Sequence, residues 1–125
     1  MDEKNIIIKK WLENLCKKKY WSDYLAEYGY YNIAIYGAGD IGRCLEWELK
    51  DTKINVVFFI DKKAEFMREI DHVPVILMDE LPLKQDLVDA IVVTIPYLDK
   101  KILTDVLCIN SDLPVMSLRD MVFEL

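Results

Sequence analysis

The chain has 125 residues, of which 53% are hydrophobic and 30% charged, and its 16 basic and 22 acidic side chains give a formal net charge of -6. This length allows one domain with a real core, and the hydrophobic fraction excludes a disordered chain. The acidic balance argues against a nucleic-acid partner, because binding to the phosphate backbone needs clustered cations. We expect no membrane insertion, since no apolar run approaches the roughly 20 residues of a membrane span.

The N-terminus and the cysteines indicate a cytoplasmic protein. The first ten residues lack the charged and apolar regions of a signal peptide. Cys16, Cys44 and Cys108 are odd in number, far apart and outside any paired motif. We therefore expect reduced thiols in the core rather than a disulfide framework or a zinc site.

The first predicted element is an N-terminal helical arm over residues 1–30. Between Lys4 and Gly29, apolar and aromatic residues recur every three or four positions, which predicts two helices, with Ser22 as an N-cap and Gly29 as a stop. Two interpretations of the arm stay open: it forms an interface with a second copy or a partner protein, or it covers a bare face of the sheet. Its aromatic residues are Trp11, Tyr20, Trp21, Tyr24 and Tyr28.

Residues 31–125 alternate short apolar runs with amphipathic stretches. The runs predict strands at 32–36, 55–60, 73–77, 90–95 and 114–117. The stretches predict helices at 41–50, around 81–87, at 100–109 and from about 118, while the charged segment 61–72 is expected to be a loop with at most a turn or two of helix. This order predicts an α/β, Rossmann-like three-layer fold with a mainly parallel five-stranded sheet.

A glycine motif follows the first predicted strand and opens a helix, which is the context that a dinucleotide-binding turn requires. In such a motif the first glycine permits the tight turn, the second lets a pyrophosphate approach the backbone, and the third lets helix and strand pack closely. The helix N-terminus then offers free N–H groups to an anion. The motif consists of Gly37, Ala38, Gly39, Asp40, Ile41 and Gly42.

Three charged residues near the motif bear on the ligand. Asp61 ends the second predicted strand, at the offset of about 20 residues where a carboxylate receives ribose hydroxyls and favours NAD over NADP; the alternative is that it caps the next turn. Asp40 suits the helix dipole but opposes a phosphate, whereas Arg43 could reach one from the same turn. The alternative for these two is a neutralising Asp40–Arg43 pair.

Several runs resemble the Rossmann-like nucleotide-binding domains of bacterial polysaccharide biosynthesis, which occur in nucleotide-sugar dehydratases and before the β-helix of sugar O-acetyltransferases. The runs are IAIYGAGDIG (33–42), VFFID (57–61), VPVI (73–76), MDEL (78–81) and DAIVVT (89–94). The resemblance extends from Tyr31 to the end of the chain, and His72 departs from it where related domains often have glycine. It implies NAD or a UDP-sugar at the glycine turn, with contacts at Gly37, Ala38, Gly39, Ile41, Gly42 and Asp61.

The sequence offers weaker evidence for chemistry than for binding. Thr94 and Tyr97 lie at the end of the fourth predicted strand, where open α/β sheets place ligands, and are secondary binding candidates. Tyr97 and Lys101 have a Tyr-x-x-x-Lys spacing without an upstream Ser partner, so we do not expect a catalytic dyad, and the lone His72 does not predict a metal site.

We therefore expect a nucleotide-binding domain in sugar or cell-envelope polysaccharide metabolism, without its own catalytic apparatus. One alternative is a component of an NAD-dependent nucleotide-sugar oxidoreductase or dehydratase. The other is an interaction scaffold with a vestigial pocket.

Overall fold

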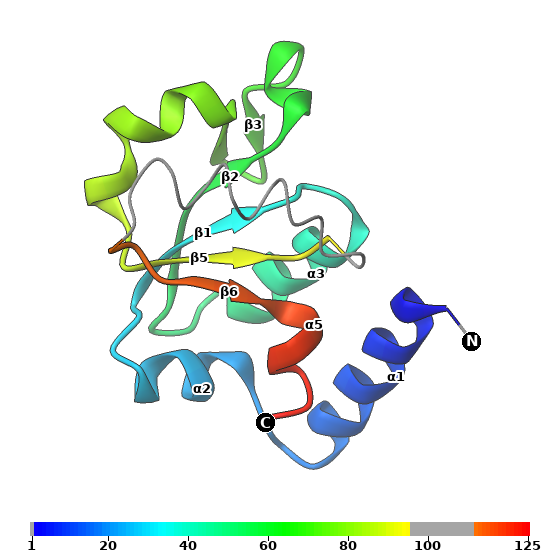
Figure 1. The fold of residues 1–125 in the computed structure, drawn as a ribbon. Helices are drawn as coiled ribbons and strands as arrows, with labels where there is room; N and C mark the ends of the chain where they lie inside the picture. The colour runs from blue at the N-terminus through cyan, green and yellow to red at the C-terminus, as the bar shows by residue number, and fades with distance from the viewer. Residues whose placement is uncertain (1, 96–111) are drawn as a thin grey trace.

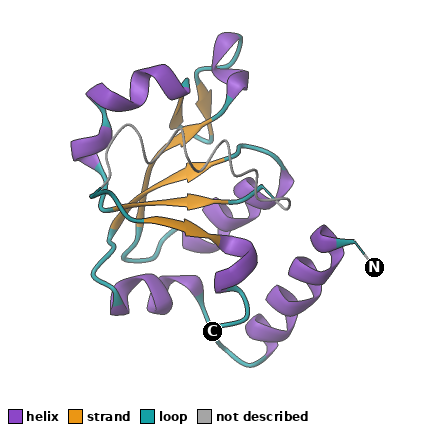
Figure 2. Cartoon of the chain, viewed as in Figure 1, coloured by secondary structure: helices purple, strands orange, loops and turns teal. Residues whose placement is uncertain are grey.

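The computed structural model describes residues 2–95 and 112–125, and it has a six-stranded sheet with helical segments on both faces (Figures 1 and 2). The strand order is β3-β4-β2-β1-β5-β6, and every neighbouring pair is parallel except β3 with β4. This confirms the predicted Rossmann-like α/β fold. The strands are β1 (Asn32–Tyr36), β2 (Asn55–Ile60), β3 (Glu69–Ile70), β4 (Val73–Ile76), β5 (Ala90–Val93) and β6 (Val115–Ser117).

The helices fall close to their predicted positions. The α-helices are α1 (Glu3–Cys16), α2 (Trp21–Glu27), α3 (Asp40–Leu49) and α5 (Leu118–Met121). Three short 3-10 helices are η1 (Lys62–Glu65), η2 (Met78–Leu83) and η3 (Gln85–Leu87). The helix predicted at 100–109 lies outside the described residues. No helix in the described part of the chain is long and apolar enough to cross a membrane.

Two differences from the predicted elements have local causes. The sheet has a sixth strand, β3, because Asp71 (φ 50°) and His72 (φ 67°) form a two-residue hairpin with β4. A hairpin of this kind requires positive φ at both central residues. Asn-Gly or Asp-Gly is typical of such a turn, and the sequence Asp-His is not, so the hairpin was not predicted. The helix expected around 81–87 is replaced by η2 and η3, because Pro82 cannot donate to an α-helical ladder.

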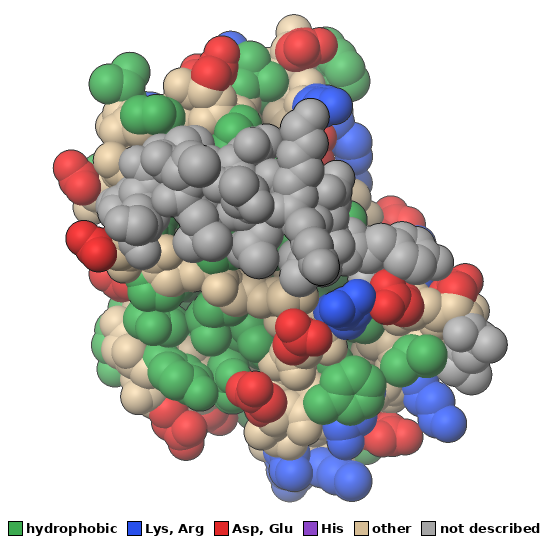
Figure 3. Space-filling model, viewed as in Figure 1, with side chains coloured by type: hydrophobic (Ala, Val, Ile, Leu, Met, Phe, Trp, Pro, Cys, Tyr) green, Lys and Arg blue, Asp and Glu red, His purple; other side chains and the backbone are tan. Residues whose placement is uncertain are grey.

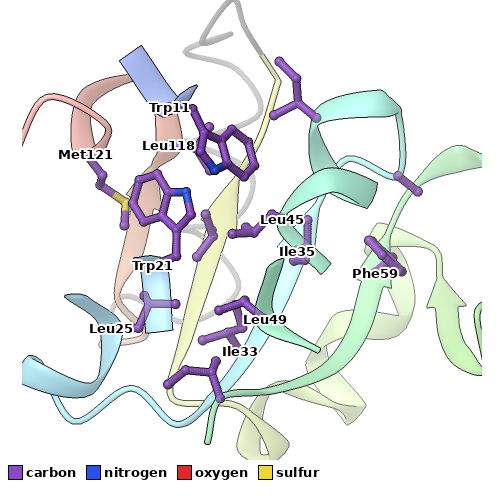
Figure 4. Close-up of a cluster of buried hydrophobic side chains, with 14 of the residues drawn as sticks. Trp11, Trp21, Leu25, Ile33, Ile35, Leu45, Leu49, Phe59, Leu118 and Met121 are labelled. Atoms are coloured by element: carbon purple, nitrogen blue, oxygen red, sulfur yellow. The ribbon is translucent and has the colours of Figure 1, made fainter. Parts of the chain in front are cut away.

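The arm packs into the main core. Ile7, Trp11, Trp21 and Leu25 are each at least 93% buried, in one cluster with residues of β1, α3 and α5. Figure 4 shows the indoles of Trp11 and Trp21 beside Leu118 and Met121 and facing Leu45. Of the two interpretations of the arm, the structure shows core completion. Its role as an interface with a second copy or a partner protein stays a prediction, which light scattering of the full chain tests.

Polar contacts fix the arm to the rest of the chain. The Glu48 carboxylate on α3 accepts hydrogen bonds from the indole Nε1 of Trp11 (2.6 Å) and from the backbone N–H of Trp21 (2.8 Å). Arg119 of α5 pairs with Glu3 at 2.9 Å. The predicted N-cap Ser22 was wrong: α2 begins at Trp21, and Glu48 satisfies that N–H from a distant part of the sequence.

The predicted burial of the cysteines was also wrong for the two cysteines that the structure describes. Cys16 and Cys44 are free thiols, and both are exposed. Cys16 ends α1, and Cys44 lies on the solvent side of α3. Cys108 lies outside the described residues.

The lysine run that follows α1 is exposed to solvent. Lys17, Lys18 and Lys19 are exposed at the connection between α1 and α2, where Figure 3 shows basic side chains at the lower edge of the molecule.

Glu46 on α3 gives the fold a specific pH dependence. Its side chain is 6% exposed, Oε2 has no hydrogen-bond partner among the described residues, and burial together with the nearby Asp71 raises its pKa. Because the folded-state pKa lies above that of the unfolded chain, ionised Glu46 destabilises the fold at neutral pH, and the penalty fades as the pH falls through the raised pKa.

We expect Glu46→Gln to raise the free energy of unfolding at neutral pH, with a gain that shrinks toward about pH 4, near the ordinary carboxyl pKa. Urea unfolding at several pH values measures this difference. A difference that does not change with pH would contradict the explanation.

Candidate functional site

A cavity of about 410 Å³ lies at the carboxyl ends of β1, β2 and β5. The chain leaves β1 toward β2 on one side, and β5 lies on the other, so this is the point of an open α/β sheet where ligands bind. The cavity is lined by Lys4, Tyr36, Gly37, Gly39, Ile41, Gly42, Ile60, Asp61, Lys62, Lys63, Thr94 and Ile95.

The three glycines of the motif differ in their backbone conformation and in what surrounds them. Gly37 has φ +109°, and its N–H donates to the carbonyl of Ile60 at 2.9 Å, which closes the turn against β2. A Cβ on Gly42 would lie 1.9 Å from the carbonyl oxygen of Gly37, so only glycine allows α3 to pack this closely on the turn. A Cβ on Gly39 would meet nothing within 4 Å. The space beside Gly39 is therefore open to a ligand.

Thr94 supports the turn from beneath. Its side chain is 4% exposed, and Oγ1 lies 3.0 Å from the carbonyl oxygen of Tyr36 and 3.1 Å from that of Gly37. The structure thus places Thr94 at the cavity, as predicted. It also shows that the Thr94 hydroxyl donates a hydrogen bond to the carbonyl groups of the turn. A direct contact between Thr94 and a ligand stays a prediction, and so does the role of Tyr97, which lies outside the described residues.

Asp61 clamps the glycine turn. One carboxylate oxygen, Oδ2, accepts a hydrogen bond from the N–H of Ala38 at 2.8 Å, and the other, Oδ1, accepts one from the N–H of Lys63 at 2.8 Å. The turn-capping alternative is therefore present in the structure, together with a second bond that ties η1 to the turn. Asp61 also lines the cavity, so its predicted contact with a ribose stays a prediction.

Three lysines around the cavity were not predicted as site residues. Lys63 crosses the turn and donates from Nζ to the carbonyl of Ala38 at 3.1 Å. Lys62 and Lys4 also line the cavity, the latter from α1. Among the described residues of the lining Asp61 is the one acidic side chain, so these lysines give this part of the cavity a net positive charge that favours an anionic ligand.

Asp40 and Arg43 do not form the pair that one sequence interpretation expected. Asp40 lies 3.5 Å from Nζ of Lys4, and its side chain is largely exposed. The guanidinium of Arg43 lies over the ring of Trp47, 5.4 Å from its centroid, and Arg43 does not line the cavity. The structure therefore does not bring Arg43 to the place where a phosphate would sit.

The N-terminus of α3 completes the site. The N–H groups in the first turn of a helix have no partner within the helix, and the helix dipole places partial positive charge there. Ile41 and Gly42 belong to this turn and line the cavity beside the open Gly39. The arrangement suits binding of a phosphate or diphosphate group.

No comparable arrangement supports a metal. The described residues contain no group of three or more metal-ligating side chains. His72 is 98% exposed in its side chain and lies 3.2 Å from Glu69, far along the sheet from the glycine turn.

Lys63→Met tests the charge of the site, because methionine keeps an unbranched side chain but removes the cation. We expect a folded protein whose affinity for a nucleotide diphosphate falls about tenfold, the effect of losing one charge-assisted hydrogen bond. Isothermal titration calorimetry measures it. Lys53→Met, just before β2 at the opposite end of that strand, is the matched control, and an equal loss in both variants would contradict a local role for Lys63.

Comparisons with known proteins support the fold. No protein-family model matches the chain, and no curated protein matches it. The chain is similar in structure to RSP, a Rex-family repressor, with a TM-score of 0.54 and 18% sequence identity. The match covers 75% of this chain and 56% of the repressor chain. At this identity the likeness shows a Rossmann-like fold and no more.

Proposed function

We propose that this chain binds a nucleotide, NAD or a UDP-sugar, with its phosphates at the glycine turn and the N-terminus of α3. The observation that carries the proposal is the positively charged cavity at the switch point of the sheet, where the space beside Gly39 is open. The dimensions agree, because a cavity of about 410 Å³ falls within the usual range for small-molecule sites, roughly 300–1,000 Å³.

The described lining favours a binding role over catalysis. It offers lysines, the clamped carboxylate of Asp61, the buried hydroxyl of Thr94 and the phenol of Tyr36, and Asp61 and Thr94 already hold the turn through hydrogen bonds. A general acid or base must reach a substrate proton with a free and suitably tuned group. We therefore propose a sensor, subunit or domain of a larger assembly. Catalytic groups of an NAD-dependent nucleotide-sugar oxidoreductase would then come from another chain.

The setting in sugar or cell-envelope polysaccharide metabolism rests on the sequence resemblance alone. The structural neighbour is a repressor, so the expected absence of nucleic-acid binding also stays a prediction. The net charge of -6 supports the prediction that the chain does not bind nucleic acid. A gel-shift assay with random duplex DNA at low salt tests this prediction.

The experiment that tests the proposal is differential scanning fluorimetry with NAD, NADP, UDP-sugars, coenzyme A and S-adenosylmethionine. We expect one nucleotide class to raise the melting temperature of the wild type. Gly39→Val should stay folded and lose this shift, because the side chain fills the space that a phosphate needs, while Gly39→Ala should lose only part of it. If no nucleotide gives a shift at millimolar concentration, the vestigial scaffold becomes the better description.

The same panel tests the preference for NAD over NADP. The Asp61 carboxylate disfavours a 2′-phosphate, whereas Lys62 and Lys63 beside it would attract one. A larger shift with NAD would support a ribose contact at Asp61. Equal shifts would leave Asp61 with the clamping role alone.

A further inference from the structure

An apolar groove adjoins the candidate nucleotide site. It has a volume of about 470 Å³ and runs between α1 and α3. Three of its hydrophobic residues are unusually exposed: Ile8 at 38%, Leu12 at 57% and Trp47 at 52%. Ile8 and Leu12 are one helical turn apart on α1, so they form a continuous wall along that side. The remaining apolar lining comes from Trp11, Leu15 and Ile41.

The groove is continuous with the cavity at the glycine turn. Lys4 and Ile41 line both hollows. The ion pair between Lys4 and Asp40, 3.5 Å long, lies where they meet. Going from the glycine turn along α1, the lining thus changes from lysines and helix N–H groups to hydrocarbon and indole side chains. A molecule bound across both hollows would be anionic at one end and apolar at the other.

We propose that this site also takes a diphosphate that carries a hydrocarbon chain, with the diphosphate at the glycine turn and the chain in the groove between α1 and α3. The proposal rests on the proposed phosphate site and extends it to the substituent that the phosphates carry. Two ligand types have a diphosphate and a hydrocarbon chain: prenyl diphosphates, in which the chain is joined directly to the diphosphate, and acyl-coenzyme A, in which a nucleotide is present and the pantetheine arm separates the acyl chain from the diphosphate.

A hydrocarbon chain in the groove would explain why α1 has apolar side chains on a face that does not pack on the sheet. α1 buries Ile7 and Trp11 on the sheet side, and a helix serving the core alone would expose polar residues elsewhere. Instead it presents Ile8 and Leu12 toward Trp47 across the groove. A hydrocarbon chain would remove these side chains from water, while Lys4 would be free to pair with the diphosphate in place of Asp40.

Calorimetric titration of the full chain with two ligand series tests the proposal. One series is coenzyme A, acetyl-coenzyme A and octanoyl-coenzyme A, and the other is inorganic pyrophosphate, isopentenyl diphosphate and farnesyl diphosphate, all below their micellar concentrations. A fully buried methylene tightens binding about fourfold, and for a groove open on one side we expect about twofold, or roughly 60-fold over the six methylenes from acetyl to octanoyl. A gain in the first series alone would identify an acyl nucleotide, and a gain in both would mean that the nucleoside is not required.

The variant Leu12→Gln tests whether the hydrocarbon chain of the ligand lies in the groove. The residue is exposed, so the variant should fold, and it should lose at least about fivefold in affinity for the longest ligand of the series while binding coenzyme A or pyrophosphate as the wild type does. Leu83→Gln, on η2 and 89% exposed, is the matched control and should change neither affinity.

If the short ligands bind but chain length has no effect, the groove proposal is overturned and the phosphate site stands. If no ligand of either series binds while NAD or a UDP-sugar raises the melting temperature, the groove proposal fails and the nucleotide site stands; if those nucleotides give no shift either, both proposals fail. A chain-length gain that Leu12→Gln leaves unchanged would also overturn the groove, because the chain would then lie elsewhere.

Discussion

Trp21→Ala is expected to lower the free energy of unfolding by about 3–5 kcal/mol, the usual cost of truncating a buried tryptophan. Trp21 is 1% exposed and lies in edge-to-face contact with two rings, with centroid distances of 6.1 Å to Trp11 and 5.7 Å to Tyr24. An alanine there would leave a cavity between the arm and the sheet. Urea unfolding followed by far-UV circular dichroism measures the loss.

Two variants make this a test of the arm as part of the core. Trp47→Ala deletes the same side chain at a site that is 52% exposed, and it should cost far less. Trp21→Phe should also be milder than Trp21→Ala, because it keeps most of the ring volume and removes an indole N–H that is buried without a partner among the described residues. If Trp21→Ala were as mild as Trp47→Ala, the arm would not be packed as described.

Gly42→Ala is expected to cost about 3 kcal/mol, at the upper end of the range for overpacking a tight contact. The new Cβ would lie 1.9 Å from the carbonyl oxygen of Gly37 and 3.1 Å from Oγ1 of Thr94. Neither can yield easily, since one is backbone and the other is held by its own hydrogen bonds. Chemical unfolding measures the stability, and any nucleotide-induced thermal shift should disappear with the turn geometry.

Gly39→Ala is the control for that change. It adds the same methyl group at a neighbouring glycine of the motif where nothing lies within 4 Å, so the apo protein should unfold at nearly the wild-type urea concentration. Equal destabilisation by both variants would mean that the turn does not have the close approach seen between α3 and Gly37.

Much of the fold was predictable because its signals are local. The apolar runs at 32–36 and 55–60 became β1 and β2 with the predicted bounds, since buried parallel strands read as continuous hydrophobic runs. The glycine turn was predictable for the same reason: a strand, three glycines at fixed spacing and a helix are contiguous in sequence. The tight turn at Gly37 and the close helix packing at Gly42 follow from stereochemistry alone, whereas the approach of a pyrophosphate to Gly39 stays a prediction.

The unpredicted features depend on contacts between distant parts of the chain. Lys4 reaches the cavity only because α1 packs beside α3, and no periodicity in the arm shows that placement. Glu48 replaces a local N-cap at Trp21 through tertiary packing. Lys62 and Lys63 were visible beside Asp61, but the reach of Lys63 across the turn depends on the 3-10 geometry of η1.

Nitrogen–proton NMR of the labelled protein, during titration with the nucleotide that gives the largest thermal shift, tests whether the glycine turn and the start of α3 hold the phosphates of a nucleotide. We expect concentration-dependent shifts of the backbone amides of Gly39, Ile41 and Gly42, smaller changes at the far ends of β1 and β2, and no response in Gly39→Val. Shifts that leave these amides unchanged and map instead to another surface would contradict a phosphate site at the glycine turn.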